Sequence, residues 1–277
     1  MTGSRPGDRE DNHCRSTHRA RARLRSRYVW IPILYLAAYV IFVRLRAFAN
    51  QTGIPVRFRY PIQVDHALFA GHDPTVWLQA TLRQAGHINW LDSLLVAVYV
   101  TYFFVPHLVA LYFWLRRDVR TVRYVLAFFG TLYVGLIPIF LVPTAPPWLA
   151  SERGYLPPFM RVVPTAINHI IPGSFGIGDQ LAGQNDVAAM PSLHMAGICV
   201  VAFVLARWRA PLGAILAVVY ILAMGFALVY LGEHYLSDVV AGLVLAAAVW
   251  YVAQRVARHR GGGLSRSTST ERQARSG

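Results

Sequence analysis

The stretch AAMPSLHMAGICVVAFVLA, residues 188–206, places a proline, a serine and a histidine directly before an apolar segment. Residues 195–206 carry no charged side chain, so His194 stands where an apolar helix meets a more polar region. A histidine at such a boundary has a structural explanation, as a helix cap or a hydrogen-bonding group, and a chemical one. Ionisable groups inside apolar spans are costly and mark functional sites, so the surrounding sequence decides between the two.

The rest of the chain predicts an all-α integral membrane protein. Of the 277 residues 55% are hydrophobic and 14% charged, a balance too apolar for an ordinary soluble domain. A helix that spans a bilayer needs roughly 20 apolar residues. Six segments fit, at 28–48, 91–115, 121–143, 192–208, 212–231 and 236–255, of which the fourth is short. We expect one catalytic domain, a six-helix transmembrane bundle at 28–256, between disordered cytoplasmic tails at 1–27 and 257–277.

The distribution of arginine predicts the orientation in the membrane. The net charge is +14, and all 27 basic residues counted as Lys or Arg are arginines. Of these, 20 fall in the two tails and in the connections after the second and fourth spans. If the spans alternate, these segments share one side, which the positive-inside rule makes cytoplasmic. This pattern favours a topology signal that touches anionic lipid, so we expect no nucleic-acid partner. Arginine-only usage also favours a GC-rich bacterial source, and hence a plasma membrane.

The two long connections, at 49–90 and 144–190, lie on the predicted outer side. The first begins after Ala47-Phe48-Ala49, which resembles a signal-peptide cleavage site, but Arg44 and Arg46 just before it favour a retained first span. It also contains DPTVWLQATLRQAG (73–86), which predicts a short interfacial helix. The second connection is rich in proline, and a loop of that length is usually functional.

Three ionisable side chains are predicted to meet at the outer ends of the fourth and sixth spans. His194 begins the fourth span, and YLGEHYLSDVVAGLVLA (230–246) begins the sixth. His234 and Asp238 are four residues apart and therefore share one helix face. A carboxylate beside an imidazole fixes its tautomer and favours its charged form. Pro191 and Ser192 suit a helix start whose free N–H groups favour phosphate.

Such a set suits two kinds of chemistry. Two histidines and a carboxylate can bind iron or zinc, but no further ligand cluster and no H-E-x-x-H pattern is present. The alternative is phosphoryl transfer, in which one imidazole attacks phosphorus, the other protonates the leaving oxygen and the aspartate orients the attacker. The residues by themselves leave both kinds of chemistry open.

The segments MPSLH (190–194) and HYLSD (234–238) resemble the two hallmark segments of the type 2 phosphatidic acid phosphatase superfamily. They are most similar to its branch of inositol phosphorylceramide synthases and related inositolphosphotransferases, as is PTAPPW (143–148). By order of elements the similarity covers about residues 60–256. The resemblance implies that His234 is the nucleophile of a phosphohistidine intermediate, that Asp238 supports it, and that His194 is the acid for the leaving group. It implies transfer of a phosphoryl-alcohol group, such as inositol phosphate, between lipids at the outer face. It also implies chemistry that uses no metal, so we expect no metal and no cofactor.

The sequence departs from the better-known phosphatases of that superfamily at their cationic phosphate clamps. Their P-S-G-H segment is Pro191-Ser192-Leu193-His194 here, their S-R pair falls on Ala227 and Leu228, and their K-x6-R-P segment has no match. We expect Ser192, Arg153 and Arg161 to bind the substrate in their place. A phosphodiester carries less charge than a phosphomonoester dianion and needs fewer clamps, which favours a transferase.

Two alternatives stay open at this point. A lipid phosphatase acting on phosphatidic acid or a prenyl phosphate would use the same residues with water as the acceptor. A transporter or scaffold would use the histidines only for packing or proton relay, although the discontinuous spans and repeated halves of many transporters are not evident. The expected partners are a phospholipid or other lipid phosphate and the membrane, while the sequence leaves the oligomeric state open.

Overall fold

The computed structural model describes residues 29–83, 87–170, 173, 176, 186–208 and 211–273, with side chains described up to residue 255 apart from residue 170. The predicted N-terminal tail at 1–27 lies outside these residues. Within the described part of the chain the regular elements are all helices, and extended pairing is limited to two isolated bridges, Arg57 with Thr144 and Thr144 with Ala188. The predicted all-α fold class is confirmed.

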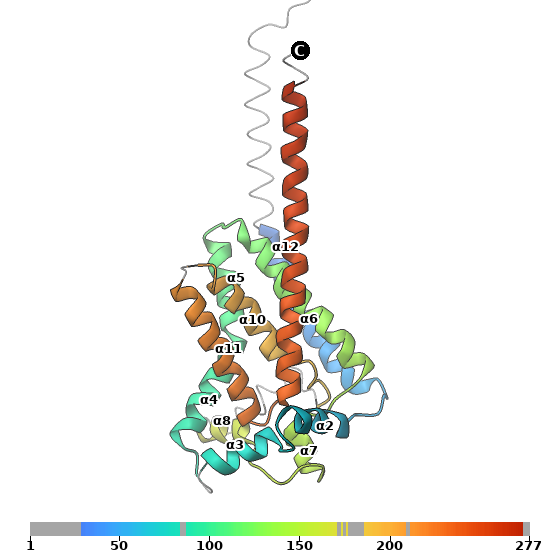
Figure 1. Cartoon of the computed structure of the whole chain (residues 1–277), viewed down its shortest axis with the longest axis vertical. Coiled ribbons are helices and arrows are strands. Elements are labelled where there is room, and N and C mark those ends of the chain that lie inside the picture. The colour runs from blue at the N-terminus through green and yellow to red at the C-terminus, as the bar shows by residue number, and fades with distance from the viewer. Residues whose placement is uncertain are drawn as a thin grey trace, which may run out of the picture.

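Four helices are long and apolar enough to cross a membrane. They are the first helix (Val29–Gln51, which ends in the 3-10 turn η1, Ala49–Gln51), α6 (Arg120–Leu141), α11 (Leu212–Tyr230) and the part Leu236–Arg255 of α12 (Leu236–Gln273). Figure 1 shows α12 running the length of the bundle and beyond it. The predicted disordered tail at 257–277 overlaps the end of this helix, and its disorder stays a prediction.

A fifth candidate span is bent. The predicted segment 91–115 consists of α4 (Trp90–Val100), η2 (Thr101–Phe103) and α5 (Val105–Leu115), which meet at an angle of 43°. Pro106 stands in the first turn of α5. Proline has no N–H to donate to the carbonyl four residues earlier, and its ring clashes with that carbonyl, so it favours a bend at this place. The bend turns η2 toward the centre of the bundle, where it contacts α10.

The predicted fourth span is a short helix in the middle of the protein. α10 (Leu193–Leu205) has 13 residues, which at 1.5 Å per residue is about 20 Å and less than the thickness of a bilayer core. By length alone the described helices therefore give four or five spans, fewer than the six predicted. Apart from His194 in its first turn, α10 is apolar on all sides, and it contacts α11, α12 and α6. A helix surrounded by protein in this way does not have to match the thickness of the lipid.

Short helices cover the end of the bundle at which α12 begins (Figure 1). They are α2 (Arg59–Leu68), α3 (Pro74–Leu82), α7 (Pro147–Glu152) and α8 (Val162–Ile170). α3 is the short helix predicted within 73–86. The Thr75 hydroxyl donates to the Val229 carbonyl and the Gln79 amide to the Tyr230 carbonyl, each at 2.8 Å. These bonds attach α3 to carbonyls in the last turn of α11, where helical partners are few.

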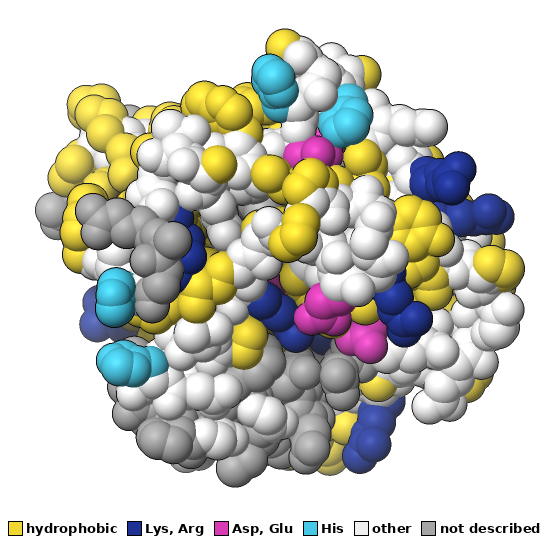
Figure 2. Space-filling model, turned by 90° about the horizontal axis from the view of Figure 1, so that it is seen from below, with side chains coloured by type: hydrophobic (Ala, Val, Ile, Leu, Met, Phe, Trp, Pro, Cys, Tyr) yellow, Lys and Arg dark blue, Asp and Glu magenta, His cyan; other side chains and the backbone are white. Residues whose placement is uncertain are grey.

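The sides of the bundle and its covered end differ in polarity. Large apolar side chains are exposed along the long helices, such as Leu126 on α6 and Leu222 on α11, both 66% exposed. A surface of this kind is stable in lipid rather than in water, so the protein is an integral membrane protein. Figure 2 looks onto the covered end, where acidic and basic side chains gather near the middle of the face.

Candidate active site

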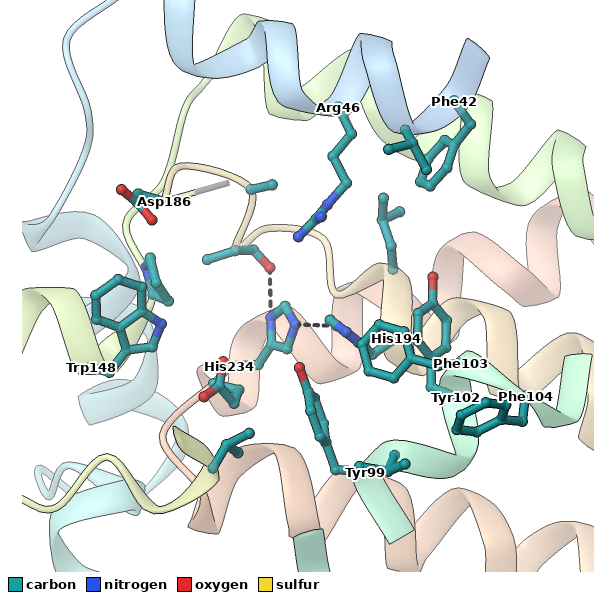
Figure 3. A pocket seen from close by; sticks show the side chains of 18 of the residues that line it. Phe42, Arg46, Tyr99, Tyr102, Phe103, Phe104, Trp148, Asp186, His194 and His234 are labelled. Atoms are coloured by element: carbon teal, nitrogen blue, oxygen red, sulfur yellow. Dashed lines mark hydrogen bonds between the residues drawn. The ribbon is translucent and has the colours of Figure 1, made fainter. Parts of the chain in front are cut away.

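A cavity of about 340 Å³ lies between the first helix, η2, the start of α10 and the turn before α12. His194 and His234 both line it, so the structure brings together the two histidines that are 40 residues apart in the sequence. Figure 3 shows an aromatic wall around His194, formed by Tyr102, Phe103 and Phe104. On the other side of His234 the same view places Trp148 and Asp186, so the cavity has an aromatic and a more polar side.

Hydrogen bonds fix the orientation of the His234 ring. Its Nδ1 atom lies 2.9 Å from the Ala189 carbonyl oxygen, and its Nε2 atom lies 3.0 Å from Nδ1 of His194. A carbonyl oxygen can only accept, so Nδ1 of His234 carries the hydrogen and donates it. In the neutral ring Nε2 is then the acceptor, and Nδ1 of His194 donates to it. The free electron pair of His234 therefore points at His194.

Asp238 lies on the opposite side of the His234 ring from His194. Its Oδ2 atom is 3.5 Å from Nδ1 of His234, too long for a strong hydrogen bond but close enough for a charge contact. The same oxygen accepts the backbone N–H of Tyr235 at 2.9 Å, so the carboxylate also caps the start of α12. The structure thus places Asp238 beside His234 and not in contact with the cavity.

A second buried carboxylate, Asp65 of α2, caps the same helix from a distant part of the chain. It is 1% exposed, and its two oxygens accept the backbone N–H groups of Leu236 and Ser237, each at 2.8 Å. Burial raises the pKa of Asp65, and these hydrogen bonds partly offset the rise. The negative charge suits the N-terminus of a helix. The sequence analysis missed Asp65, because nothing in the chain near it indicates which helix it caps.

The PTAPPW segment at 143–148 is hydrogen-bonded to two segments that lie beside His234, residues 187–189 and the turn at Gly232. The Thr144 N–H donates to Val187 at 2.8 Å, and the Thr144 carbonyl accepts the Ala189 N–H at 3.1 Å. The Trp148 N–H donates to the Gly232 carbonyl at 3.1 Å. The segment therefore fixes the carbonyl that binds Nδ1 of His234 and the turn that precedes His234. This gives a physical reason for a motif that the sequence offered only as a resemblance.

Two glycines allow the elements of the site to approach each other. Gly232 has a φ of +74°, and a Cβ atom there would lie 2.4 Å from the ring of Phe159. At Gly242 of α12 a Cβ atom would lie 2.4 Å from the Ser192 carbonyl oxygen. The Ser192 N–H also donates to the Asp238 carbonyl at 3.0 Å. The starts of α10 and α12 are thus in backbone contact, which holds the two histidines together.

The predicted substrate-binding residues are placed differently from one another. Arg161 lines the cavity, where its guanidinium lies 3.5 Å from the centroid of the Trp148 ring and its Nε 3.8 Å from Glu233. Ser192 is buried at the N-cap of α10, where its hydroxyl accepts the Met195 N–H at 3.2 Å. Arg153 is an exposed residue at the end of α7. Neither Ser192 nor Arg153 lines the cavity, and their substrate contacts stay predictions.

The cavity also contains charged residues to which the sequence analysis gave no binding role. Arg46 of the first helix and Asp186 both line it. Arg46 carried a detectable signal, because an arginine within an apolar helix is costly unless it faces protein or a polar cavity. Ala227 and Leu228, which occupy the places of the S-R pair in the better-known phosphatases, are both 0% exposed in the core of the bundle. No group of three or more His, Cys, Asp or Glu residues in the described part of the chain is arranged to hold a metal ion.

Comparison with known proteins bears out the resemblance. The phosphoinositol dihydroceramide synthase of Bacteroides thetaiotaomicron is 32% identical over 160 residues, which cover 53% of this chain and 50% of that relative. The chain thus matches about half the length of this relative, and no solved structure matches it. The expected similarity to the inositol phosphorylceramide synthase branch, and the expectation of an enzyme of the phosphatase or phosphotransferase type, are confirmed. The sequence model of the PAP2 superfamily matches residues 62–252, more than half of the chain and a range that includes His194, His234 and Asp238, so the chain belongs to the PAP2 superfamily.

Proposed function

We propose that the protein is a lipid phosphotransferase that moves a phosphoryl-alcohol group, with inositol phosphate as the first candidate, from one lipid to another. The observation that carries the proposal is the state of His234, whose Nδ1–H is held by the Ala189 carbonyl so that Nε2 presents its electron pair to the cavity. The relative named phosphoinositol dihydroceramide synthase supports inositol phosphate as the group and a ceramide as the acceptor. The aromatic wall of the cavity suits the apolar part of a lipid.

In the first step Nε2 of His234 attacks the phosphorus atom of the donor. A P–N bond forms, the bond from phosphorus to the donor lipid oxygen breaks, and His194, entering as the imidazolium, gives that oxygen a proton. The positive charge that develops on His234 is stabilised by Asp238, 3.5 Å from Nδ1. Because the two rings are hydrogen-bonded at 3.0 Å, they must separate for a phosphoryl group to lie between them.

In the second step the acceptor alcohol replaces the departed lipid. Neutral His194 removes the proton from the acceptor hydroxyl as its oxygen attacks phosphorus, and the P–N bond breaks to release His234. His194 ends as the imidazolium with which it began, so the cycle is balanced in protons. Water in place of the alcohol would give hydrolysis, the reaction of a lipid phosphatase.

The location of the reaction follows from the arginine pattern. In our proposal α10 counts as a sixth membrane segment, embedded in the bundle, and both termini are cytoplasmic. The cavity and the short helices then lie on the extracytoplasmic side of a bacterial plasma membrane. Reaction of a cysteine introduced at exposed Leu82 on α3 with a membrane-impermeant thiol reagent, in intact cells, tests this orientation. Labelling that required broken cells would reverse it.

The function is tested with purified protein in detergent, phosphatidylinositol labelled at phosphorus, and dihydroceramide as acceptor. His234→Ala is the inactive variant, and His72→Ala is its matched control, because His72 is an exposed histidine in the turn before α3. We expect a new labelled lipid with the wild type and His72→Ala and none with His234→Ala. Water-soluble label without a new lipid would establish a phosphatase instead. No turnover of phosphatidylinositol would remove inositol phosphate as the transferred group.

A further inference from the structure

We infer that Arg46, on the first helix, binds the phosphate of the substrate beside the two histidines. The inference rests on the proposed function for the nature of the substrate, a lipid phosphodiester, and deepens it by assigning the cation that receives the negative charge. The family match begins at residue 62, so it includes neither Arg46 nor the helix that carries it. The assignment is therefore built from the cavity itself.

The first helix turns one face toward the bundle, and Arg46 lies on that face. Tyr35, Tyr39, Phe42, Arg46 and Ala49 follow each other at spacings of three or four residues, the spacing of one helix face. Phe42 is 4% and Ala49 is 2% exposed, so both neighbours of Arg46 on this face are buried. Arg46 itself is half-buried between them and lines the cavity.

Hydrogen bonds and ring contacts hold the first helix in this rotation. The Tyr35 hydroxyl lies 2.6 Å from Nδ1 of His107 on α5, and the Tyr133 hydroxyl of α6 donates to the Ala38 carbonyl at 2.8 Å. The ring of Tyr39 stands edge-on to that of His107, with the centroids 4.9 Å apart. Because the helix is fixed at these points, the direction of Arg46 into the cavity is a property of the fold rather than of one flexible side chain.

The position of Arg46 relative to the histidines suits a phosphate ligand. Figure 3 shows its side chain extending from the first helix toward the pair His194 and His234. A phosphate group that reaches Nε2 of His234 thus comes close to a guanidinium. Arginine matches this ligand, because its planar donors can form two parallel bonds to phosphate oxygens. A phosphodiester anion in an apolar cavity needs such a partner, since an uncompensated buried charge is costly.

Arg161 is the other cation among the described residues that line the cavity. The guanidinium of Arg161 stacks on Trp148, and its Nε lies 3.8 Å from Glu233, whose carboxylate offsets its charge. In the view of Figure 3, Trp148 and Arg46 lie on different sides of His234. The places of the S-R pair at Ala227 and Leu228 are in the core and supply no cation. The assignment of the phosphate to Arg46 rests on its direction toward the two histidines.

The experiment compares Arg46→Gln with Arg44→Gln in the full-length protein. Arg44 lies two residues earlier on the same helix and is exposed on another face, so its substitution removes the same charge without touching the cavity. Binding of tungstate, an oxyanion of phosphate-like shape, is measured by calorimetry in detergent. We expect the affinity to fall about 10-fold or more in Arg46→Gln, the size of a lost charge-assisted hydrogen bond, and to be unchanged in Arg44→Gln.

Arg46→Lys keeps the inference testable if the glutamine variant unfolds, because it preserves the charge and removes only the paired donors. We expect an intermediate tungstate affinity for it. Equal affinities in wild type, Arg46→Gln and Arg46→Lys would overturn the inference, and so would a wild type that binds no tungstate. The transfer assay separates this result from the proposed function. If Arg46→Gln turns over phosphatidylinositol with an unchanged KM, the role of Arg46 is wrong and the proposed function stands. If tungstate binding depends on Arg46 but phosphatidylinositol is not turned over, the choice of donor is wrong and the role of Arg46 stands.

Discussion

The two helix starts next to the histidines, α10 at His194 and α12 just after His234, are capped in different ways. α10 is capped by its own Ser192, whose hydroxyl accepts a backbone N–H three residues later. α12 is capped by Asp238 in its first turn and also by Asp65, which comes from a helix about 170 residues earlier. Between these helix starts, His194 and His234 share one hydrogen bond. The comparison indicates that local sequence alone caps the helix that contains His194, whereas the helix that follows His234 is capped by both local sequence and the tertiary fold.

The largest expected effect separates the two histidines. If His234 is the nucleophile, His234→Ala should lower turnover on the order of 10⁴-fold or more. His194→Ala, which removes a general acid, should lower it by about 10²- to 10⁴-fold. A phosphodiester with a nitrophenol leaving group needs no proton at its oxygen and should restore much of the rate to His194→Ala. Single-turnover kinetics with this substrate measures the difference, and equal rescue of both variants would contradict the assigned roles.

The next effect concerns the carboxylate beside His234. Asp238→Asn keeps the shape of the side chain but removes the charge that faces Nδ1 of His234 at 3.5 Å. We expect the rate of the first step to fall about 10- to 100-fold, because the cation that forms on His234 loses its counter-charge. Rapid-quench measurement of labelled protein, in parallel with thermal unfolding, checks this. A variant that forms labelled protein at the wild-type rate would assign Asp238 to helix capping only.

The sequence was sufficient for the parts of the site that depend on local patterns. The spacing of four positions between His234 and Asp238 predicted that they would lie side by side, and the positions of His194 and His234 at two helix starts predicted that they would meet. It was not sufficient for contacts between distant segments. Asp65 and Arg46 are single charged residues whose surroundings are set by how helices pack. The count of six spans is not confirmed by helix length, because α10 is too short, although a helix enclosed by protein need not be long enough to span lipid.

A smaller effect is expected at Asp65, a positioning residue that does not touch the cavity. Asp65→Asn leaves one acceptor oxygen for two backbone N–H groups, so the start of α12 should shift together with His234. Misplacement of a reacting group lowers kcat, here by about 10-fold, while KM stays near its wild-type value. Asp73→Asn is the control, because Asp73 lies on the same covered end and pairs with His66. Equal kcat values for the two variants would contradict a positioning role for Asp65.

The smallest effect is expected at the start of α10. Ser192→Ala removes the hydroxyl that accepts the Met195 N–H, and loss of such a cap costs about 1 kcal/mol of unfolding free energy. Because the side chain is 0% exposed and does not line the cavity, KM should stay close to that of the wild type. Denaturant unfolding and steady-state kinetics measure the two quantities separately. A rise in KM without loss of stability would instead support the substrate contact that the sequence predicts for Ser192, and the start of α10 would then face the phosphate.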